Sequence, residues 1–310
     1  MIVITTPTGR IGSQIVERLL DGPRPVRVVV RDPARLDPRV RELAEVVRGS
    51  HADAAVLAEA FDGAETVFWV VPPDLHGGDP REYYLDFSRP ACAAFTQHGV
   101  RRVVAVTSLG HGYRGEAGHL TAAMAMDEMI RDTGVGYRAL AAPFFMENLL
   151  RYADSIRGRA SFAMANLADQ PLASVATRDI ASVGARLLLD SSWTGQSNVP
   201  VAGPEDLTPR AMADIISAVL ARPVRFEQIS VAEYHAMLTG HGLSGQSAKG
   251  LADIVAGQND RIYDYEPHAE PVLAAPTTFR DWCEQELRPA VEAAGRSADR
   301  REPSGRRTGA

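Results

Sequence analysis

The first half of the chain alternates short apolar runs with segments of helical period. The apolar runs are nearly uniform, as in strands that are covered on both faces of a sheet. They lie at residues 2–5 (IVIT), 26–30 (VRVVV), 45–48 (EVVR), 66–71 (TVFWVV), 101–107 (RRVVAVT) and 137–142 (YRALAA). Helices fit between them at about residues 11–20, 53–61, 80–98 and 118–133. This order predicts an α/β fold with a doubly wound parallel sheet.

The regular alternation of strands and helices ends after about residue 143. The later pattern predicts helices at FFMENLLRYADSI, RDIASVGARLLLD, after Leu207-Thr208-Pro209, and near 231–239 and 246–257, and short strands at 171–177, 197–201 and 224–229. We therefore expect a sheet domain over residues 1–150 with 174–203 interleaved into it, and a smaller, mostly helical part over 151–290 that contributes a lid. Residues 296–310 are charged and Gly/Ser-rich, which predicts a disordered tail.

Composition narrows the class of protein. The 310 residues are 45% hydrophobic and 23% charged, which is enough for a large buried core. No apolar run approaches the roughly 20 residues of a membrane span, and the first strand leaves no room for a leader, so we expect a cytoplasmic protein with no membrane partner. A net charge of −6 gives no basic face for nucleic acid. Neither the spacing of Cys92 and Cys283 nor that of the histidines indicates a disulfide or a metal site.

The turn after the first strand reads Thr6-Pro7-Thr8-Gly9-Arg10-Ile11-Gly12. Gly9 lets backbone N–H groups approach a pyrophosphate, and the helix that begins at about Arg10 directs its positive dipole end toward that charge. Gly12 allows the helix to pack closely on the strand. The turn therefore predicts a dinucleotide-binding site of the Rossmann type. The alternative is that both glycines serve only the turn.

The end of the second strand, VVVRDP, indicates which dinucleotide binds. An NAD-specific site usually places an acid there for the adenosine ribose. Here Arg31 occupies the position, followed by Asp32 and, one turn later, Arg35. Guanidinium groups suit a 2′-phosphate, because they donate paired, charge-assisted hydrogen bonds. We therefore expect NADPH rather than NADH, with a solvated Arg/Asp pair as the alternative.

Several segments, in this order and spacing, resemble the NmrA-like, atypical short-chain dehydrogenase/reductase family. They are TPTGRIG, VVVRDP, Asp53 followed by FDGAETVFWVVPP, VVAVTSLG, YRALAAPFFMENLL, RDIASVGARLL and VAGPEDLT. The similarity extends over about residues 1–288. The family comprises NADP(H) binders, including quinone and isoflavone-type reductases, natural-product ketoreductases and redox-sensing regulators.

The resemblance implies which residues contact NADPH. Thr8, Gly9, Arg10, Ile11 and Gly12 hold the pyrophosphate, Arg31 the 2′-phosphate, Asp53 and Ala54 the adenine, Val70, Val71 and Pro72 line the cofactor, and Pro143 and Phe144 approach the nicotinamide. Thr6, Arg35 and Thr107 are counted with these cofactor residues. Thr6 stands where the family usually has the first glycine of the turn, which should tighten the backbone.

The family's usual catalytic pair is missing. Reductases of the family place a Tyr and a Lys four residues apart on the helix after the fifth strand, and counted back from Glu128 these positions are Leu120 and Met124. Neither side chain can donate a proton, and the only lysine, Lys249, lies far along the chain. The candidate proton donors are Ser108 at the end of the fifth strand and His111, Tyr113 and His119 after it. Each has an alternative as a turn cap, an exposed loop residue or a packing residue.

These features predict a reductase that transfers hydride from NADPH to a ketone or quinone of a hydrophobic aromatic substrate. The strong preference for arginine over lysine suggests a GC-rich coding sequence, which is compatible with antibiotic or other specialised-metabolite biosynthesis. The missing Tyr and Lys leave a second class open, a non-catalytic NADP(H)-binding regulator that senses redox state. An isomerase or epimerase on the same fold is a third. Monomer and homodimer are equally compatible with the sequence.

Overall fold

The centre of the fold is an eight-stranded sheet in which neighbouring strands pair in parallel. The computed structural model describes residues 1–74, 77–266 and 273–299. The strands are β1 (Ile2–Ile4), β2 (Val26–Val30), β3 (Glu45–Arg48), β4 (Thr66–Trp69), β5 (Arg102–Ser108), β6 (Gly136–Ala142), β10 (Gln196–Ala202) and β13 (Leu273–Ala274). Their order, β13-β10-β6-β5-β4-β1-β2-β3, confirms the predicted doubly wound parallel sheet.

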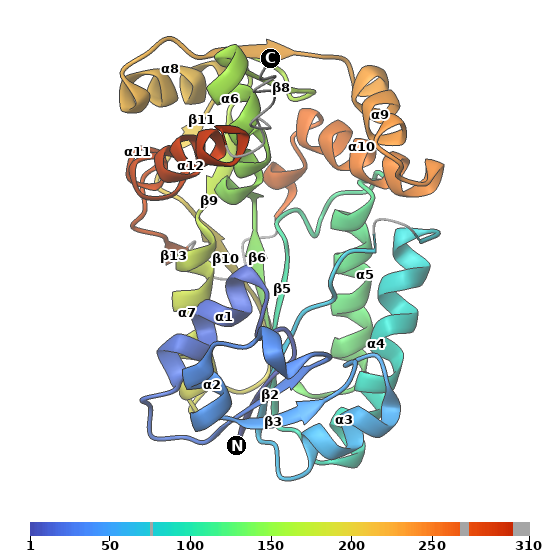
Figure 1. Ribbon diagram of the computed structural model, residues 1–310. Helices are drawn as coiled ribbons and strands as arrows, with labels where there is room; N and C mark the ends of the chain where they lie inside the picture. The colour runs from blue at the N-terminus through green and yellow to red at the C-terminus, as the bar shows by residue number, and fades with distance from the viewer. Residues whose placement is uncertain (75–76, 267–272, 300–310) are drawn as a thin grey trace, which may run out of the picture.

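Helices cover both faces of this sheet (Figure 1). They are α1 (Arg10–Leu19) and α7 (Thr177–Leu189) on one face, and α3 (Ala54–Phe61), α4 (Pro80–Gln97) and α5 (His119–Asp132) on the other. In β1, Ile2 and Ile4 pack with α1 and α7, whereas Val3 packs with the opposite layer. Because successive side chains of a strand point to opposite faces, a strand covered on both faces must be uniformly apolar. Beside β2 lie the short η1 (Pro33–Arg35) and α2 (Pro38–Leu43).

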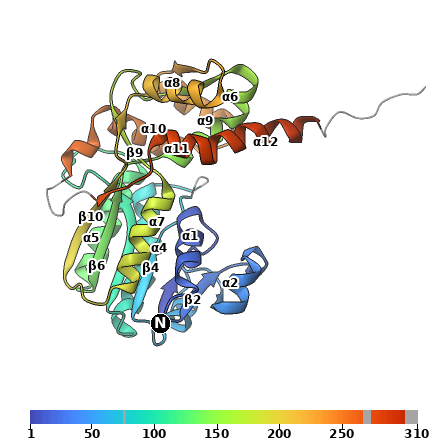
Figure 2. The ribbon, with the colours of Figure 1, turned by 90° about the vertical axis from the view of Figure 1, so that its left-hand side faces the viewer.

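A smaller part stands over the carboxyl ends of the strands, at the top of Figure 1 and, in the turned view, of Figure 2. Its strands are β7 (Phe144–Phe145), β8 (Ser161–Met164), β9 (Leu172–Val175), β11 (Asp206–Leu207) and β12 (Arg225–Gln228). Its helices are η2 (Met146–Tyr152), α6 (Ala153–Arg159), α8 (Pro209–Leu220), α9 (Val231–Gly240), α10 (Gly245–Asn259), η3 (Ile262–Tyr265), α11 (Phe279–Trp282), η4 (Cys283–Leu287) and α12 (Arg288–Asp299). The described residues include no helix long and apolar enough to cross a membrane.

Two segments depart from their predicted form. FFMENLLRYADSI is not one helix, because Phe144 and Phe145 pair with β9 as a strand and the helical turns begin only at Met146. Tertiary pairing here overrides a helical pattern that follows Pro143 directly. At the other end, α12 extends to Asp299, past the predicted start of the tail at 296. Residues 300–310 lie outside the described residues.

The chain returns to the sheet after entering the smaller part. The segment predicted to be interleaved, 174–203, contributes α7 and β10, and β10 pairs with β6. The sequence did not indicate that β13 adds a further parallel strand beside β10. Both parts are therefore joined by several crossings of the chain, which fixes the smaller part over the edge of the sheet.

A buried ionic cluster ties the loop after β5 to α5 and to the segment after η3. His111 Nε2 lies 2.9 Å from Asp127 Oδ2, and His111 Nδ1 lies 3.1 Å from Glu266 Oε2. The backbone N–H groups of Gly110 and His111 donate to the same Glu266 oxygen, and the Tyr137 hydroxyl donates to Asp127. Burial lowers the pKa of His111, but hydrogen bonds to the two carboxylates and their charges outweigh it and raise this pKa to about 9. The imidazole is therefore charged at neutral pH and holds the loop.

This cluster predicts how the free energy of unfolding depends on pH. In the unfolded chain a histidine titrates near pH 6.5, so the stabilisation from charged His111 is complete below about that pH and is lost as pH rises through about 9. Urea unfolding should show wild type losing stability relative to His111→Gln between about pH 6 and pH 10, by on the order of 3 kcal/mol. His241→Gln, an exposed residue at the end of α9, is the control. A pH-independent difference between wild type and His111→Gln would contradict the charged cluster.

Candidate active site

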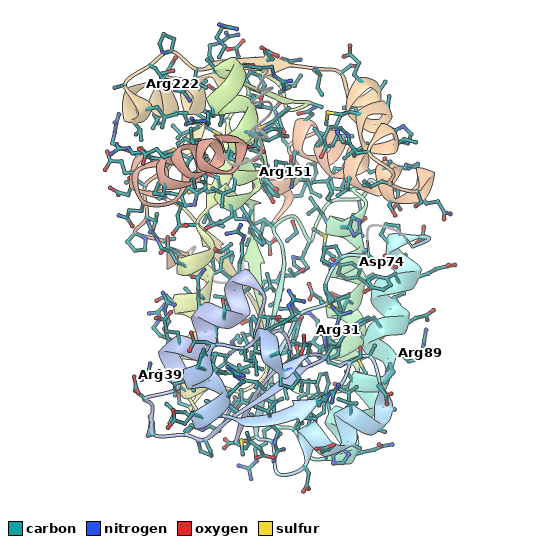
Figure 3. The ribbon with its side chains drawn as sticks, in the orientation of Figure 1. Arg31, Arg39, Asp74, Arg89, Arg151 and Arg222 are labelled. Atoms are coloured by element: carbon teal, nitrogen blue, oxygen red, sulfur yellow. The ribbon has the colours of Figure 1, made fainter. Side chains whose placement is uncertain are left out.

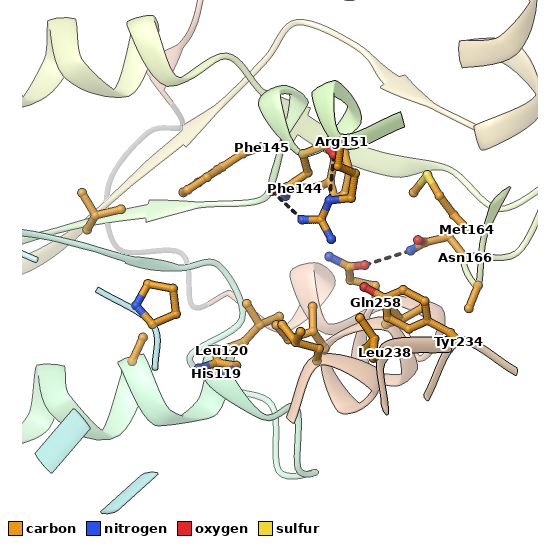
Figure 4. Close-up of a pocket in the computed structure, with 18 of the residues that line it drawn as sticks. His119, Leu120, Phe144, Phe145, Arg151, Met164, Asn166, Tyr234, Leu238 and Gln258 are labelled. Carbon is orange, nitrogen blue, oxygen red and sulfur yellow. Dashed lines mark hydrogen bonds between the residues drawn. The ribbon is translucent and has the colours of Figure 1, made fainter. Parts of the chain in front are cut away.

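A cavity of about 570 Å³ lies where the carboxyl ends of the strands meet the smaller part (Figure 4). Its sheet side includes Ile11, Val70, Val71, Val106, Thr107 and His119. Its other side includes Phe144, Phe145, Arg151, Met164, Tyr234 and Gln258. Ligands of doubly wound sheets bind at the carboxyl ends of the strands, which is where this cavity opens. Most of the lining is apolar, so it suits a ligand with an apolar body.

The predicted dinucleotide turn stands at one end of this cavity. Gly9 is the N-cap of α1, and its N–H donates to the Thr6 carbonyl over 3.1 Å. Thr8, Gly9 and Arg10 are exposed at the amino end of the helix, where backbone N–H groups have no partner within the helix. A Cβ on Gly12 would lie 1.9 Å from the Thr6 oxygen, so only glycine fits this contact. The turn therefore has the close helix–strand approach that a pyrophosphate site requires.

The residues expected at the adenosine end lie on the loops after β2 and β3. Arg31 and Arg35 have exposed side chains that are open to a phosphate. Asp53 is the N-cap of α3, and its Oδ1 accepts from the N–H groups of Ala55 (2.8 Å) and Val56 (3.4 Å). Asp53 thus has a structural role in any case, and its contact with adenine stays a prediction.

His51 is a buried residue that the sequence analysis missed. Its Nε2 lies 3.0 Å from the Val70 carbonyl oxygen. Burial lowers the pKa of His51 to about 4, and the charge of Arg31 adds to this effect against the opposing hydrogen bond. The ring is therefore neutral and donates its N–H to Val70, which fixes the backbone that lines the cavity. In the sequence, only its position two residues before Asp53, the N-cap of α3, could have pointed to this histidine.

Thr107 gives the clearest indication of a ligand beside the turn. Its side chain is buried, it lines the cavity, and its Oγ1 has no hydrogen-bond partner. A buried hydroxyl without a partner costs about 1–3 kcal/mol, so a polar ligand group is expected here. Val70, Val71 and Phe144 also line the cavity, but Pro72 and Pro143 do not. Instead, the carbonyl of Pro72 accepts from the Tyr83 hydroxyl over 3.0 Å.

His119 is the candidate proton donor that the structure brings into the cavity. It is the first residue of α5, it is 7% exposed, and both of its ring nitrogens are buried without a partner. Burial lowers its pKa, and the negative charge of Asp74 only partly opposes this. The ring is thus neutral at pH 7 and carries one N–H donor and one acceptor. Leu120, at the position of the family's tyrosine, lines the cavity beside it, and Met124 packs with Ala117 and Ile262.

The other three candidate donors do not line the cavity. Ser108 Oγ donates to the Leu109 carbonyl over 3.0 Å, and the Tyr113 hydroxyl donates to Asp260 Oδ2 over 2.9 Å. His111 is held in the ionic cluster by both ring nitrogens. The loop after β5 is drawn toward these partners and away from the cavity, which argues against a role at the substrate for these residues.

The cavity also contains polar residues that the sequence analysis did not identify. Asn148 and Arg151 come from η2, Asn166 follows β8, and Gln258 is on α10. Their segments show no pattern that separates a side chain facing a cavity from one facing solvent. Among the described residues no group of His, Cys, Asp and Glu could hold a metal ion.

The close contact at Gly12 predicts the effect of adding one methyl group. Gly12→Ala must displace either the Thr6 carbonyl or α1, which moves the N–H groups that would hold a pyrophosphate. We expect the Kd for NADPH to rise at least about tenfold, equal to about 1.4 kcal/mol, by calorimetry. Gly158→Ala on α6 is the matched control, because a Cβ there meets nothing within 4 Å. Unchanged affinity in Gly12→Ala would argue against the turn as the binding site.

Comparison with known proteins gives the family. Residues 7–191 match the NAD(P)H-binding family. The (4-alkanoyl-5-oxo-2,5-dihydrofuran-3-yl)methyl phosphate reductase of Streptomyces griseus is 35% identical over 232 residues, which are 74% of this chain and 78% of that protein. The NAD(P)H azoreductase of Xenophilus azovorans is 27% identical, over 83% of this chain and 86% of that protein.

A solved structure agrees with the fold. The NADPH-dependent quinone oxidoreductase of Escherichia coli, complexed with NADPH, has a TM-score of 0.75 at 22% identity, over 96% of this chain and 100% of that one. The family match covers more than half of the chain and contains the glycine turn, Arg31, Thr107 and His119. The chain therefore belongs to the NAD(P)H-binding family, among the NmrA-like, atypical short-chain dehydrogenases/reductases that its segments resemble, and it is an NAD(P)H-dependent oxidoreductase.

Proposed function

We propose that the protein is an NADPH-dependent reductase of conjugated, electron-poor carbonyl compounds, such as a quinone, an activated ketone or an unsaturated lactone, with a hydrophobic ring. The observation that carries the proposal is His119, a residue that lines the apolar cavity and whose two ring nitrogens are buried without a hydrogen-bond partner. A buried, neutral imidazole without a protein partner is suited to meet a carbonyl oxygen of a ligand. The cavity volume and its apolar walls fit a small ring system.

The residues of this chain fit NADPH. The amino end of α1 and Gly12 would hold its pyrophosphate, Arg31 and Arg35 its 2′-phosphate, and Thr107 a polar group of its nicotinamide end. When bound, NADPH supplies the hydride. The solved relative from Escherichia coli is described with NADPH, which supports the phosphorylated form of the cofactor.

His119 would donate its N–H to the substrate oxygen on which negative charge develops. This hydrogen bond is stronger in a water-poor cavity than in water, and it positions the proton that the product finally needs. Because Leu120 and Met124 replace the family's Tyr and Lys, the protein offers less acid catalysis than its relatives with that pair. Conjugated acceptors need less acid catalysis, since the negative charge that hydride transfer creates on them is delocalised over several atoms.

The named substrates of the relatives support this choice of acceptor. A dihydrofuranone that bears an alkanoyl group, an azo compound and a quinone all have a conjugated, electron-poor acceptor. The relative from Streptomyces griseus is the most similar of these three, which supports a role in specialised metabolism. A non-catalytic redox sensor, the second class left open by the sequence, has no evident use for a buried, unpartnered histidine in the lining of an apolar cavity.

Arg31 should determine the choice between the two cofactors. In Arg31→Ala the 2′-phosphate loses a charge-assisted hydrogen bond, so kcat/KM for NADPH should fall at least about tenfold while that for NADH stays within about twofold. Steady-state rates with a quinone such as menadione measure both values. Arg39→Ala is the control, because that exposed arginine on α2 pairs with Asp21. Equal losses with the two cofactors would contradict the assignment.

His119 should affect the chemical step more than binding. We expect His119→Ala to lower kcat by about 10²-fold, in the range for loss of a general acid, with the Kd for NADPH unchanged. The screen uses quinones, alkanoyl butenolides and aryl ketones, followed by the solvent isotope effect on the best substrate. His241→Ala is the control. The reductase proposal fails if wild type oxidises NADPH only at the background rate with all three classes.

A further inference from the structure

The charge of the cavity is unbalanced. Among the described residues that line it, Arg151 is the one permanently charged side chain, and none is Asp or Glu. His119 does not supply a second charge, because burial lowers its pKa. Arg151 is an exposed residue, so its guanidinium lies at the opening of the cavity, where bulk water also reaches its charge. The described part of the lining would therefore offer an anion one cation and no competing carboxylate.

Arg151 is held in place by neutral groups. Its Nε donates to the Asn148 carbonyl oxygen over 3.0 Å, and its Nη2 donates to Asn148 Oδ1 over 3.3 Å. Over residues 1–74, 77–266 and 273–299 no acidic side chain forms an ion pair with it. Figure 4 shows the guanidinium directed into the cavity, toward Gln258. The side chain is thus oriented, and its solvated charge can meet a ligand at the opening of the cavity.

The facing wall is polar and fixed. Asn166 Nδ2 donates to Gln258 Oε1 over 2.8 Å, and Gln258 Nε2 donates to the Tyr263 hydroxyl over 2.8 Å. Asn166 is 4% exposed and Gln258 is 6% exposed. These bonds hold two carboxamides in the lining opposite the guanidinium, so this end of the cavity can receive a polar group while the rest receives an apolar one.

We propose that the substrate carries an anionic substituent, a carboxylate or a phosphate monoester, which Arg151 binds. The conjugated ring then lies against the apolar wall that includes Phe144 and Tyr234, with its reactive oxygen at His119. A guanidinium binds both anions through paired, charge-assisted hydrogen bonds, so the two share one recognition chemistry. That the bound molecule is a substrate rests on the proposed reductase function, whereas the anion site itself does not depend on that function.

The cofactor phosphates do not explain Arg151. Figure 3 shows Arg31, expected at the 2′-phosphate, beside the sheet and Arg151 in the smaller part, well separated from it. The pyrophosphate turn at Gly12 belongs to the first β–α connection, whereas Arg151 belongs to η2. We therefore expect the Kd for NADPH to be independent of Arg151.

The test is a binding measurement that needs no turnover. The NADP⁺ complex of the full chain is titrated by calorimetry with 2-naphthoate, 2-naphthyl phosphate and the neutral 2-naphthamide, which has nearly the shape of the naphthoate. Naphthoate is ionised at pH 7, so wild type should bind it about tenfold more tightly than the amide, and added salt should reduce this ratio. Arg151→Gln should bring the ratio to about one, and Arg151→Lys should restore part of it.

The control variant is Arg159→Gln, which removes the same charge from the exposed end of α6. If only 2-naphthyl phosphate binds more tightly than the amide, the anionic substituent is a phosphate monoester. If both anions bind more tightly than the amide, the site accepts carboxylates and phosphate monoesters alike. The anion site is wrong if wild type binds the naphthoate and the amide equally, or if Arg151→Gln weakens NADPH as much as it weakens the anion.

The two proposals fail separately. If naphthoate binding depends on Arg151 but no conjugated acceptor is reduced, then the reductase proposal is wrong and the anion site stands. If neutral quinones are reduced and the anion preference is absent, the anion site alone is wrong.

Discussion

The position of α1 against β1 is the constraint on which the rest of the site depends. Gly12 faces the Thr6 carbonyl at a distance that leaves no room for a Cβ, and this contact sets the helix with its amino end at the carboxyl edge of the sheet. The other strands place Val70, Val106 and Thr107 at the same edge, because parallel strands all end on one side. The close approach of α1 to β1 and the common end of the parallel strands therefore bring the helix dipole and the buried Thr107 hydroxyl to the same edge of the sheet.

The smaller part covers this edge and supplies the other side of the cavity. The chain returns from the smaller part to the main sheet at β10 and β13, so the smaller part is held over the strand ends by sheet hydrogen bonds as well as by side-chain packing. The cluster of His111, Asp127 and Glu266 fixes the loop after β5 in the same region. This arrangement separates two histidines that lie eight residues apart in sequence. His111 is charged and structural, whereas His119 is neutral and lines the cavity.

Sequence reasoning predicted the sheet and the cofactor turn because both depend on local patterns. A uniformly apolar strand such as VRVVV and a glycine turn after the first strand are readable without knowing the tertiary contacts. The orientation of single side chains was not readable. Ser108, His111, Tyr113 and His119 lie in one stretch of sequence, and only contacts with residues far along the chain, such as Glu266 and Asp260, distinguish the last of them. Arg151 was missed for the same reason, since FFMENLLRY reads as an ordinary amphipathic segment whereas its first two residues form a strand.

The loss of the Tyr/Lys pair and the polarity of the cavity have a common consequence. With Leu120 and Met124 in those positions, the described lining of the cavity includes a neutral imidazole at His119 and a positive charge at Arg151. A neutral imidazole is a weak acid, so the substrate must itself delocalise the charge that hydride transfer creates. A weak acid also depends strongly on geometry, because a hydrogen bond to a developing charge falls off steeply when it is misaligned. An anionic substituent bound at Arg151 would supply that alignment, since it fixes one end of the ring and thereby the distance of its reactive oxygen from His119. Binding energy obtained remote from the reacting atoms can in this way replace the acid strength that the missing pair would have provided.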